Sequence, residues 1–168
     1  MDRLWTPWRY QYITGESGEK SGGNSSSSTS CIFCTLPQDP AQDERNLILH
    51  RARYNFIVLN LYPYTSGHLL ISPYEHASEL DSASKETTDE LMDLTKRAQT
   101  VLRAAYQPDG FNLGMNLGRA AGAGVAAHVH LHIMPRWTGD ANFMSTIGET
   151  RILPEDLPTT YHKLYGQF

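Results

Sequence analysis

The sequence lacks several features that would place it in a large class of proteins. It has only two cysteines, and no run approaches the ~20 apolar residues that a membrane-spanning helix needs. The N-terminus "MDRLWTPWRY" carries charged and aromatic side chains but no apolar segment of the secretory kind. A formal net charge of -4 and a pI of about 5.9 provide no bulk positive charge for nucleic acid. We therefore expect a cytoplasmic protein that binds neither membranes nor nucleic acid.

The two cysteines, Cys31 and Cys34, lie together in "CIFC". A disulfide between residues this close would close too small a loop to stabilise a fold. In a chain without an export signal, the pair indicates metal binding, redox chemistry or two reduced thiols. No thioredoxin-like βαβ pattern surrounds the pair, which disfavours redox chemistry. A structural zinc site normally has four protein ligands, so two more would have to come from elsewhere.

With 168 residues the chain is long enough for one well-buried domain and short for two. We expect residues 1–13 to be an aromatic segment that docks on this domain. Residues 14–30, rich in Gly and Ser, should form a mobile linker, because such a tract buries too little apolar surface. The main domain would span residues 31–149. A C-terminal extension over 150–168 would pack on it, with a short strand near Arg151–Leu153 and a helical turn.

Apolar periodicity predicts the elements of the main domain. Stretches rich in β-branched and aromatic residues predict strands, and helical spacing predicts one long helix. The predicted strands are 46–50, 55–63, 68–73, 111–118 and the histidine-containing segment 126–137, and the predicted helix is 85–106. Short turns between most strands favour an α+β domain built on a mostly antiparallel, five-stranded sheet, with one principal helix and a shorter one.

Three of the seven histidines occupy alternate positions in "AAHVHLHIMPRW". On an extended strand His128, His130 and His132 would project from one side, and the apolar residues between them from the other. Burying three imidazoles together costs desolvation of each ring unless each has a partner. The three side chains could hold a metal, perform nucleophilic chemistry, or divide these tasks.

A glycine-rich loop, "GRAAGAGVAA", leads into this segment and carries few side chains. Such a loop lets backbone N–H groups approach an anion closely, although it is also compatible with a plain tight turn. Arg119 lies within the loop and Arg136 lies beyond the histidines. Together these features favour a phosphate-binding site.

The stretch "HVHLHIM" resembles the signature of the histidine triad nucleotide hydrolases and transferases, in which histidines alternate with apolar residues. The resemblance extends over most of the chain, through "WTPWRYQYI", "CIFC", "VLNLYPYTSGHLLISPYEH", "GFNLGMNLGRAAGAG" and "PRWTGDANFM". This longer pattern is similar to the bacterial branch related to diadenosine tetraphosphate phosphorylases and hydrolases. It implies a fold like that of the histidine triad (HIT) family, and a homodimer whose sheets join across the interface.

The resemblance implies that the middle histidine, His130, attacks the α-phosphorus of a nucleotide ester or polyphosphate. A nucleotidyl-histidine intermediate would form, and water or inorganic phosphate would resolve it. The attacking nitrogen must carry no proton, so we expect an acceptor such as a backbone carbonyl to hold the other ring N–H. His132, ~7 Å further along the strand, would order this arrangement or contact phosphate oxygens. His128 completes the triad.

Further residues match the nucleotide-binding positions of the family. The resemblance implies that Asn60 binds the ribose, that His68 lies near the nucleotide cleft, and that Asn116 approaches the phosphate and the leaving group. The loop N–H groups would stabilise charge on the phosphoryl oxygens, and the loop residues expected to do so are Gly122, Ala123, Gly124 and Val125. One departure is Ala127, where the branch commonly has an acidic residue, and this leaves the exact substrate open.

Zinc-bearing relatives in the same superfamily, including galactose-1-phosphate uridylyltransferases, imply the missing metal ligands. The matching positions are His76 and the first triad histidine, so the resemblance predicts a closed, structural zinc site of Cys31, Cys34, His76 and His128. No organic cofactor is expected.

The preferred function is cleavage of a dinucleoside polyphosphate, with diadenosine tetraphosphate favoured, by water or by phosphate. Three alternatives remain at this point. The first is hydrolysis of nucleoside phosphoramidates or adenylylated amines. All three strand histidines could bind one catalytic zinc, as in carbonic anhydrase. The protein could also bind nucleotides without useful turnover.

Overall fold

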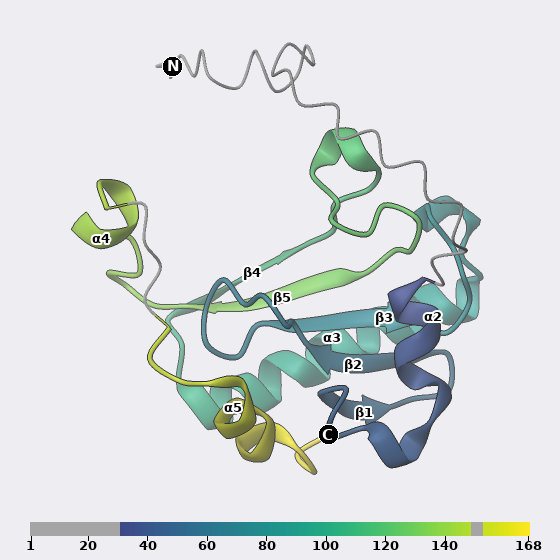
Figure 1. Ribbon diagram of the computed structural model, residues 1–168, viewed down its shortest axis with the longest axis horizontal. Coiled ribbons are helices and arrows are strands. Elements are labelled where there is room, and N and C mark those ends of the chain that lie inside the picture. Colours follow the sequence, from purple (N-terminus) through teal and green to yellow (C-terminus); the bar gives the residue numbers. More distant parts are fainter. Residues whose placement is uncertain (1–30, 149–152) are drawn as a thin grey trace.

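A computed structural model of the chain describes residues 31–148 and 153–168 (Figure 1). The predicted aromatic segment 1–13 and linker 14–30 lie outside the described residues. Of the strand expected near Arg151–Leu153, only Leu153 is described, and it lies in a loop.

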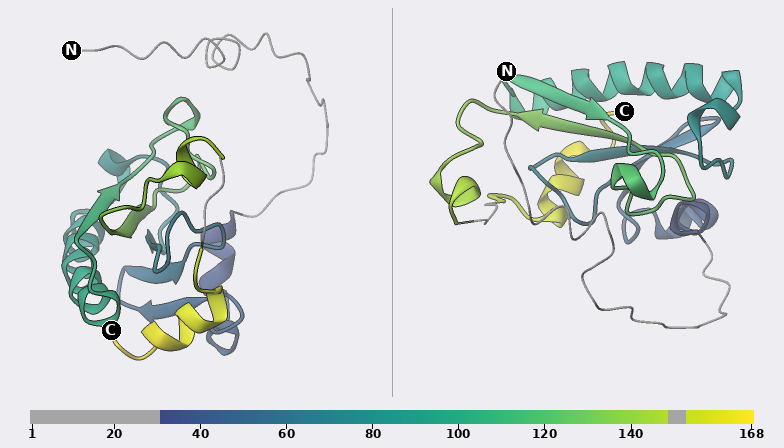
Figure 2. Two further views of the ribbon diagram at one scale, coloured as in Figure 1. Left: turned by 90° about the vertical axis from the view of Figure 1, so that its left-hand side faces the viewer. Right: turned by 90° about the horizontal axis from the view of Figure 1, so that it is seen from above.

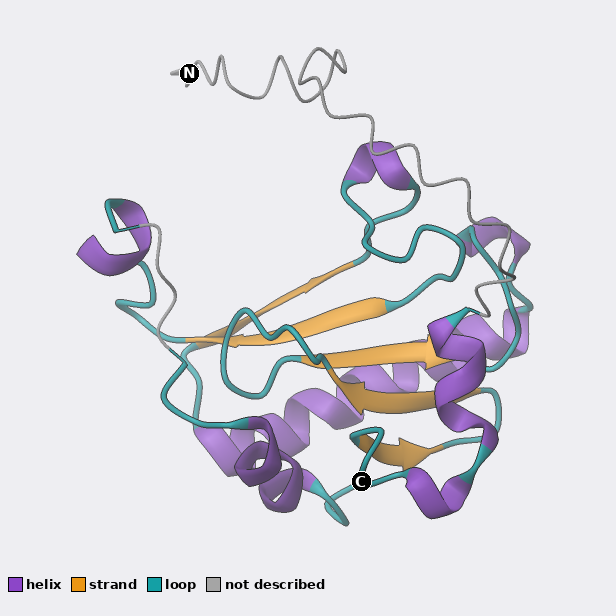
Figure 3. Ribbon diagram, viewed as in Figure 1, coloured by secondary structure: helices purple, strands orange, loops and turns teal. Residues whose placement is uncertain are grey.

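Within the described residues, five strands form one sheet in the order β1-β2-β3-β5-β4, and every neighbouring pair is antiparallel (Figure 3). The strands are β1 (Ile48–Arg51), β2 (Asn55–Leu59), β3 (Leu69–Pro73), β4 (Gly110–Gly114) and β5 (Leu131–Arg136). The predicted α+β class, the five strands and the antiparallel pairing are therefore confirmed.

The principal helix α3 (Lys85–Tyr106) has the predicted bounds. It begins at Ser84, whose side chain accepts a hydrogen bond from the backbone N–H of Thr87, and it ends at Gln107 in the left-handed conformation. The shorter helix is α5 (Leu157–Leu164), and two single-turn helices are α2 (Ile32–Thr35) and α4 (Phe143–Thr146). The 3₁₀ turns are η1 (Leu36–Gln38), η2 (Pro40–Gln42), η3 (Leu80–Ser82) and η4 (Arg119–Ala121). None of the described helices is long and apolar enough to cross a membrane.

The sheet separates two layers, with α3 along one face and α2 on the other (Figure 2). The larger apolar core lies between α3 and the sheet, and α5 adds Tyr161 and Leu164 to it. A smaller core on the opposite face joins Phe33 of α2 to Phe56, Val58 and Leu70. The faces follow from strand alternation, since Leu131 and Ile133 of β5 belong to the larger core whereas His132 projects from the other face.

The histidine segment differs from the predicted strand. Strand β5 begins only at Leu131, so His128 and His130 precede it and only His132 lies within it. The reason is that the backbone N–H of Val129 donates to the carbonyl of Ala77, at 2.7 Å, rather than continuing the pairing with β3. The apolar residues nevertheless alternate as predicted, because Val129, Leu131 and Ile133 are all buried.

Two other predicted strands are also too long. Strand β2 ends at Leu59 rather than at residue 63, because the side-chain oxygen of Asn60 accepts the N–H of Tyr62 and turns the chain. Strand β4 begins one residue earlier than expected and ends at Gly114 rather than at residue 118. The glycine-rich loop that follows has Gly118 at a φ of +78°.

Leu102 of α3 is fully buried in the larger core. We expect Leu102→Ala to lower the free energy of unfolding by about 2–5 kcal/mol, because it leaves a cavity. Met92 lies on the same helix with half of its side chain exposed, so Met92→Ala should change it by less than about 0.5 kcal/mol. Urea unfolding measures both, and equal losses would contradict this assignment of the core.

Candidate functional site

The backbone of residues 128–130 is anchored to the segment that follows β3. Besides the bond from Val129, Nε2 of His128 lies 3.0 Å from the carbonyl oxygen of Pro73. A carbonyl can only accept, so the His128 ring donates through Nε2 and keeps an unprotonated Nδ1. The ring is 1% exposed, and this burial lowers its pKa. His128 is therefore a neutral imidazole with one nitrogen free to bind a metal.

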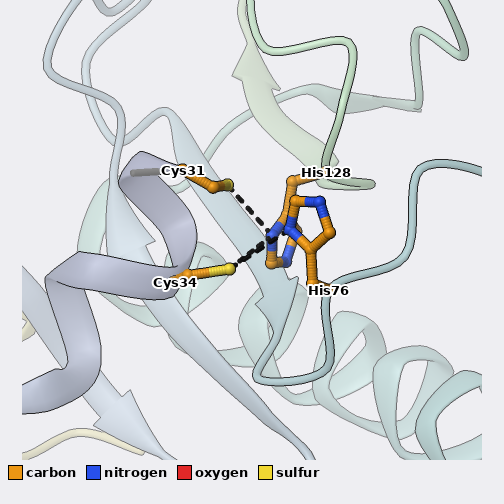
Figure 4. Close-up of side chains that lie close together, drawn as sticks. All are labelled: Cys31, Cys34, His76 and His128. Carbon is orange, nitrogen blue, oxygen red and sulfur yellow. Dashed lines mark hydrogen bonds between the residues drawn. The ribbon is translucent and has the colours of Figure 1, made fainter. Parts of the chain in front are cut away.

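This free nitrogen faces two sulfur atoms (Figure 4). His128 Nδ1 lies 3.3 Å from Cys31 Sγ and 3.5 Å from Cys34 Sγ, and Nδ1 of His76 lies 3.2 Å from Cys34 Sγ. All four ligand atoms lie within 4.8 Å of one another. The four residues expected as metal ligands are thus brought together from α2, from the loop after β3, and from the segment before β5.

The spacing of these atoms fits a tetrahedral metal site. Zinc bonds of ~2.3 Å to sulfur and ~2.05 Å to nitrogen give a sulfur–nitrogen edge of roughly 3.5 Å in a tetrahedron. The observed contacts of 3.2–3.5 Å are close to this edge. Two cysteines and two histidines would also complete the coordination, which is typical of a structural site. The cluster can therefore hold a metal ion.

His130 has the geometry expected of a nucleophile. Its Nδ1 lies 2.9 Å from the carbonyl oxygen of His128, so Nδ1 donates and Nε2 keeps its lone pair. The side chain is 6% exposed, and burial lowers its pKa, which keeps the ring neutral near pH 7. The ring of Phe33 packs against it at a centroid distance of 4.8 Å. The carbonyl acceptor expected from the sequence is present, and it is contributed by the preceding histidine of the triad.

His132 is held by a second histidine. The backbone N–H of Tyr64 donates to Nδ1 of His68, so the His68 ring carries its proton on Nε2. That nitrogen lies 2.9 Å from Nδ1 of His132, which must accept. Neutral His132 therefore carries its own proton on Nε2 and is a hydrogen-bond donor. Burial, and then the nearby His130, lower the pKa of His132 to about 4, so it stays neutral near pH 7.

His130 and His132 thus present different ring nitrogens to the site. Their rings lie 5.0 Å apart, with a lone pair on one and an N–H donor on the other. This pairing suits attack on a phosphorus centre beside an oxygen that gains charge. It does not suit a single metal bound by all three triad histidines, because His128 faces the cysteines and His132 faces His68.

One aromatic residue at this site, Tyr64, was not predicted from the sequence. The ring of Tyr64 stacks on that of His132 at 6.3 Å and lies 5.0 Å from that of His68. Gly67 makes this turn possible, because it has a φ of +72°. A Cβ there would lie 3.1–3.3 Å from side chains of α3 and β5. The local signal was the "YTSG" stretch, which indicates a turn but not where the tyrosine points.

Of the two predicted nucleotide-binding asparagines, Asn60 is linked to the triad. Asn60 Nδ2 is 3.4 Å from Nδ1 of His68, so Asn60 joins the same chain of polar contacts. Asn116 is exposed beyond the end of β4. Gly114, two residues before Asn116, is opposite His132 in the sheet.

The glycine-rich loop is more restricted as an anion site than its sequence suggests. The N–H groups of Gly122 and Ala123 donate to Arg119 and Gly118 within the loop. Those of Gly124 and Val125 have no partner among the described residues, and the Val125 side chain packs against the smaller core. Of the four residues expected to bind phosphate, the last two therefore have N–H groups available.

Comparison with known proteins is consistent with this geometry. The HIT domain model matches residues 42–139. A protein named AP-4-A phosphorylase from Mycobacterium tuberculosis is 42% identical over 160 residues, which cover 95% of this chain and 80% of that protein. Among solved structures, a Zn-bound histidine triad family protein from Mycobacterium smegmatis superposes with a TM-score of 0.65 at 27% identity. The match covers 84% of this chain and 94% of that one.

A histidine triad nucleotide-binding protein from Sulfolobus tokodaii, described as hypothetical, is also similar, with a TM-score of 0.61 and 26% identity. The match covers 80% of this chain and 91% of that one. This chain belongs to the HIT domain family, as its histidine motif predicted.

The low pKa of His132 has a consequence for stability. The unfolded chain, with an ordinary histidine pKa of 6.5, takes up the proton first as the pH falls. The stabilisation from neutral His132 is therefore complete above about pH 6.5 and is lost between there and about pH 4. We expect the free energy of unfolding to fall less between about pH 7.5 and 5 in His132→Asn than in the wild type. An unchanged pH dependence would contradict the assignment, and His162→Asn, at an exposed histidine, is the control.

Proposed function

We propose that this protein cleaves dinucleoside polyphosphates, with diadenosine tetraphosphate the favoured substrate, at the α-phosphate. The observation that carries the proposal is the bond from His130 Nδ1 to the His128 carbonyl, which leaves a buried, neutral Nε2 beside the N–H donor of His132. The similarity to the protein named AP-4-A phosphorylase supports the choice of substrate.

In the proposed reaction, the lone pair of His130 Nε2 attacks the α-phosphorus. A nitrogen–phosphorus bond forms, the bond from phosphorus to the bridging oxygen breaks, and that oxygen leaves with the bonding electrons. The N–H of His132 hydrogen-bonds to the departing oxygen, while N–H groups of Gly124 and Val125 bind the non-bridging oxygens. A second nucleophile then displaces His130 and restores its lone pair.

The second nucleophile is inorganic phosphate or water. The name of the tuberculosis relative favours phosphate, which would yield ADP and ATP from diadenosine tetraphosphate. Incubation with and without phosphate decides the point, because asymmetric hydrolysis gives AMP and ATP instead. If the protein cleaved adenosine phosphoramidate but not diadenosine tetraphosphate, it would instead be a nucleoside phosphoramidate hydrolase.

We expect His130→Ala to lower kcat/KM for diadenosine tetraphosphate by about three orders of magnitude or more, because it removes the nucleophile. His162→Ala, at an exposed histidine, is the matched control and should leave turnover unchanged. Product formation followed by chromatography measures both. Turnover by His130→Ala at the wild-type rate would exclude a nucleotidyl-histidine intermediate.

We further propose that the cluster of Cys31, Cys34, His76 and His128 holds a structural zinc ion. The contact distances and the zinc-bound relative from M. smegmatis support this assignment. Bound zinc would fix His128, and with it the carbonyl that orients His130. The homodimer and the cytoplasmic location expected from the sequence remain predictions.

If zinc is structural, the purified protein should contain about one zinc ion per chain, and Cys34→Ala should lose it. We expect the thermal unfolding midpoint of this variant to fall by several degrees, because a structural metal contributes directly to folding. Ile32→Ala, at an exposed residue of the same helix, should keep both metal and stability. Elemental analysis and calorimetry provide the readouts. Wild-type protein that is folded and free of metal would refute the proposal.

A further inference from the structure

The loop that joins β2 to β3, residues 60–68, folds back onto the ring of its own last residue. The backbone N–H of Asn60 donates to the carbonyl of His68, at 3.0 Å, and this bond closes the loop. Halfway along the loop, the backbone N–H of Tyr64 donates to Nδ1 of His68, at 3.1 Å. A ring nitrogen that accepts a hydrogen bond carries no proton, so the loop backbone decides which tautomer His68 adopts.

The hydrogen bond between His68 and His132 can form in two senses. His68 Nε2 and His132 Nδ1 lie 2.9 Å apart, and one of the two must donate. With the Tyr64 N–H in place, His68 donates and His132 keeps its proton on Nε2. If that N–H moved away, His68 could carry its proton on Nδ1, and His132 would then donate from Nδ1 and leave its Nε2 without a proton. Asn60 Nδ2 also lies near His68 Nδ1, but at 3.4 Å it is a weak donor.

The Tyr64 side chain packs on both rings of this pair. Its ring is nearly parallel to that of His132, with an interplanar angle of 7°, and is tilted by 48° against that of His68. Centroid distances of 6.3 Å and 5.0 Å fall within the range of about 4.5–7 Å in which aromatic rings attract one another. Leu61 and Tyr62, earlier in the loop, are 57% and 77% exposed. Tyr64 is therefore the residue of this loop whose aromatic ring can hold it against the pair.

We propose that Tyr64 is a positioning residue: its ring holds the loop so that its own backbone N–H keeps the proton of His132 on Nε2. The proposal rests on the proposed function, in which this Nε2–H binds the departing oxygen. Tyr64 acts through His68 and does not touch the substrate. Because the ring and the backbone N–H carry this role, the phenol hydroxyl is not required, and a phenylalanine at this position should serve as well.

Nitrogen-15 NMR of the histidine rings near pH 7 tests the proposal without any need for turnover. In the wild type and in Tyr64→Phe, the proton of His132 should reside on Nε2. In Tyr64→Ala, we expect the ratio of the two His132 tautomers to shift about tenfold toward the form protonated on Nδ1, equivalent to the loss of one hydrogen bond. An unchanged ratio in Tyr64→Ala would overturn the proposal.

Two further variants separate positioning from a general loss of structure. Tyr62→Ala removes an exposed ring from the same loop and is the matched control, so it should leave the tautomer ratio unchanged. Tyr64→Leu keeps apolar volume but has no aromatic face, and its tautomer ratio should shift as in Tyr64→Ala. It provides the same test if the alanine variant does not fold. A wild-type ratio in Tyr64→Leu would show that the aromatic ring is not needed and would overturn the proposal.

Turnover of diadenosine tetraphosphate provides a second readout. Because His132 would act on the departing oxygen, kcat should fall in Tyr64→Ala by the same factor as the fraction of His132 protonated on Nε2, while KM stays within about twofold. Tyr64→Phe should restore kcat, and an equal loss in both variants would overturn the proposal. Failure of the wild type to cleave this substrate would instead refute the proposed function, whereas the NMR ratios would still decide whether Tyr64 sets the tautomer of His132.

Discussion

The site depends on one hydrogen bond, from the ring of His130 to the carbonyl of His128. A neutral imidazole has one N–H and one lone pair, and only an acceptor on Nδ1 ensures that Nε2 is the nucleophile. The His128 carbonyl can act as this acceptor because two hydrogen bonds hold its segment in place. One runs from the Val129 N–H to the Ala77 carbonyl, and the other from the His128 ring to the Pro73 carbonyl. This also explains why β5 begins late, since an extended strand would commit the backbone to the sheet instead.

Residues 128–130 also link the metal cluster to the ring of His130. His128 offers one ring nitrogen to the cysteines and the other to Pro73, while its carbonyl orients His130. Phe33, one residue before Cys34, packs on the rings of both histidines. A metal bound at the cluster would therefore stabilise the nucleophile's orientation without touching the substrate. In the proposed mechanism the triad divides its tasks: His128 would be structural, His130 nucleophilic and His132 a hydrogen-bond donor.

The sequence predicted those parts of the molecule that periodicity or a motif specifies. Helix α3 has the bounds that its apolar spacing indicated, and His76 and His128 meet the cysteines as the resemblance implied. The backbone hydrogen-bond acceptors could not be predicted, because the carbonyls of Pro73 and Ala77 have no sequence signature. The early end of β2 at Asn60 arises from a side chain that competes with the sheet for a backbone N–H. The position of Tyr64 follows from tertiary packing around Gly67, which local propensity cannot show.

The tautomeric state of His130 tests this account most directly. Nitrogen-15 NMR of the histidine rings near pH 7 distinguishes a protonated nitrogen from one that carries a lone pair. The account predicts that His130 is neutral, with its proton on Nδ1 and none on Nε2. A proton on Nε2, or on both nitrogens, would contradict it, because His130 would then have no electron pair with which to attack phosphorus.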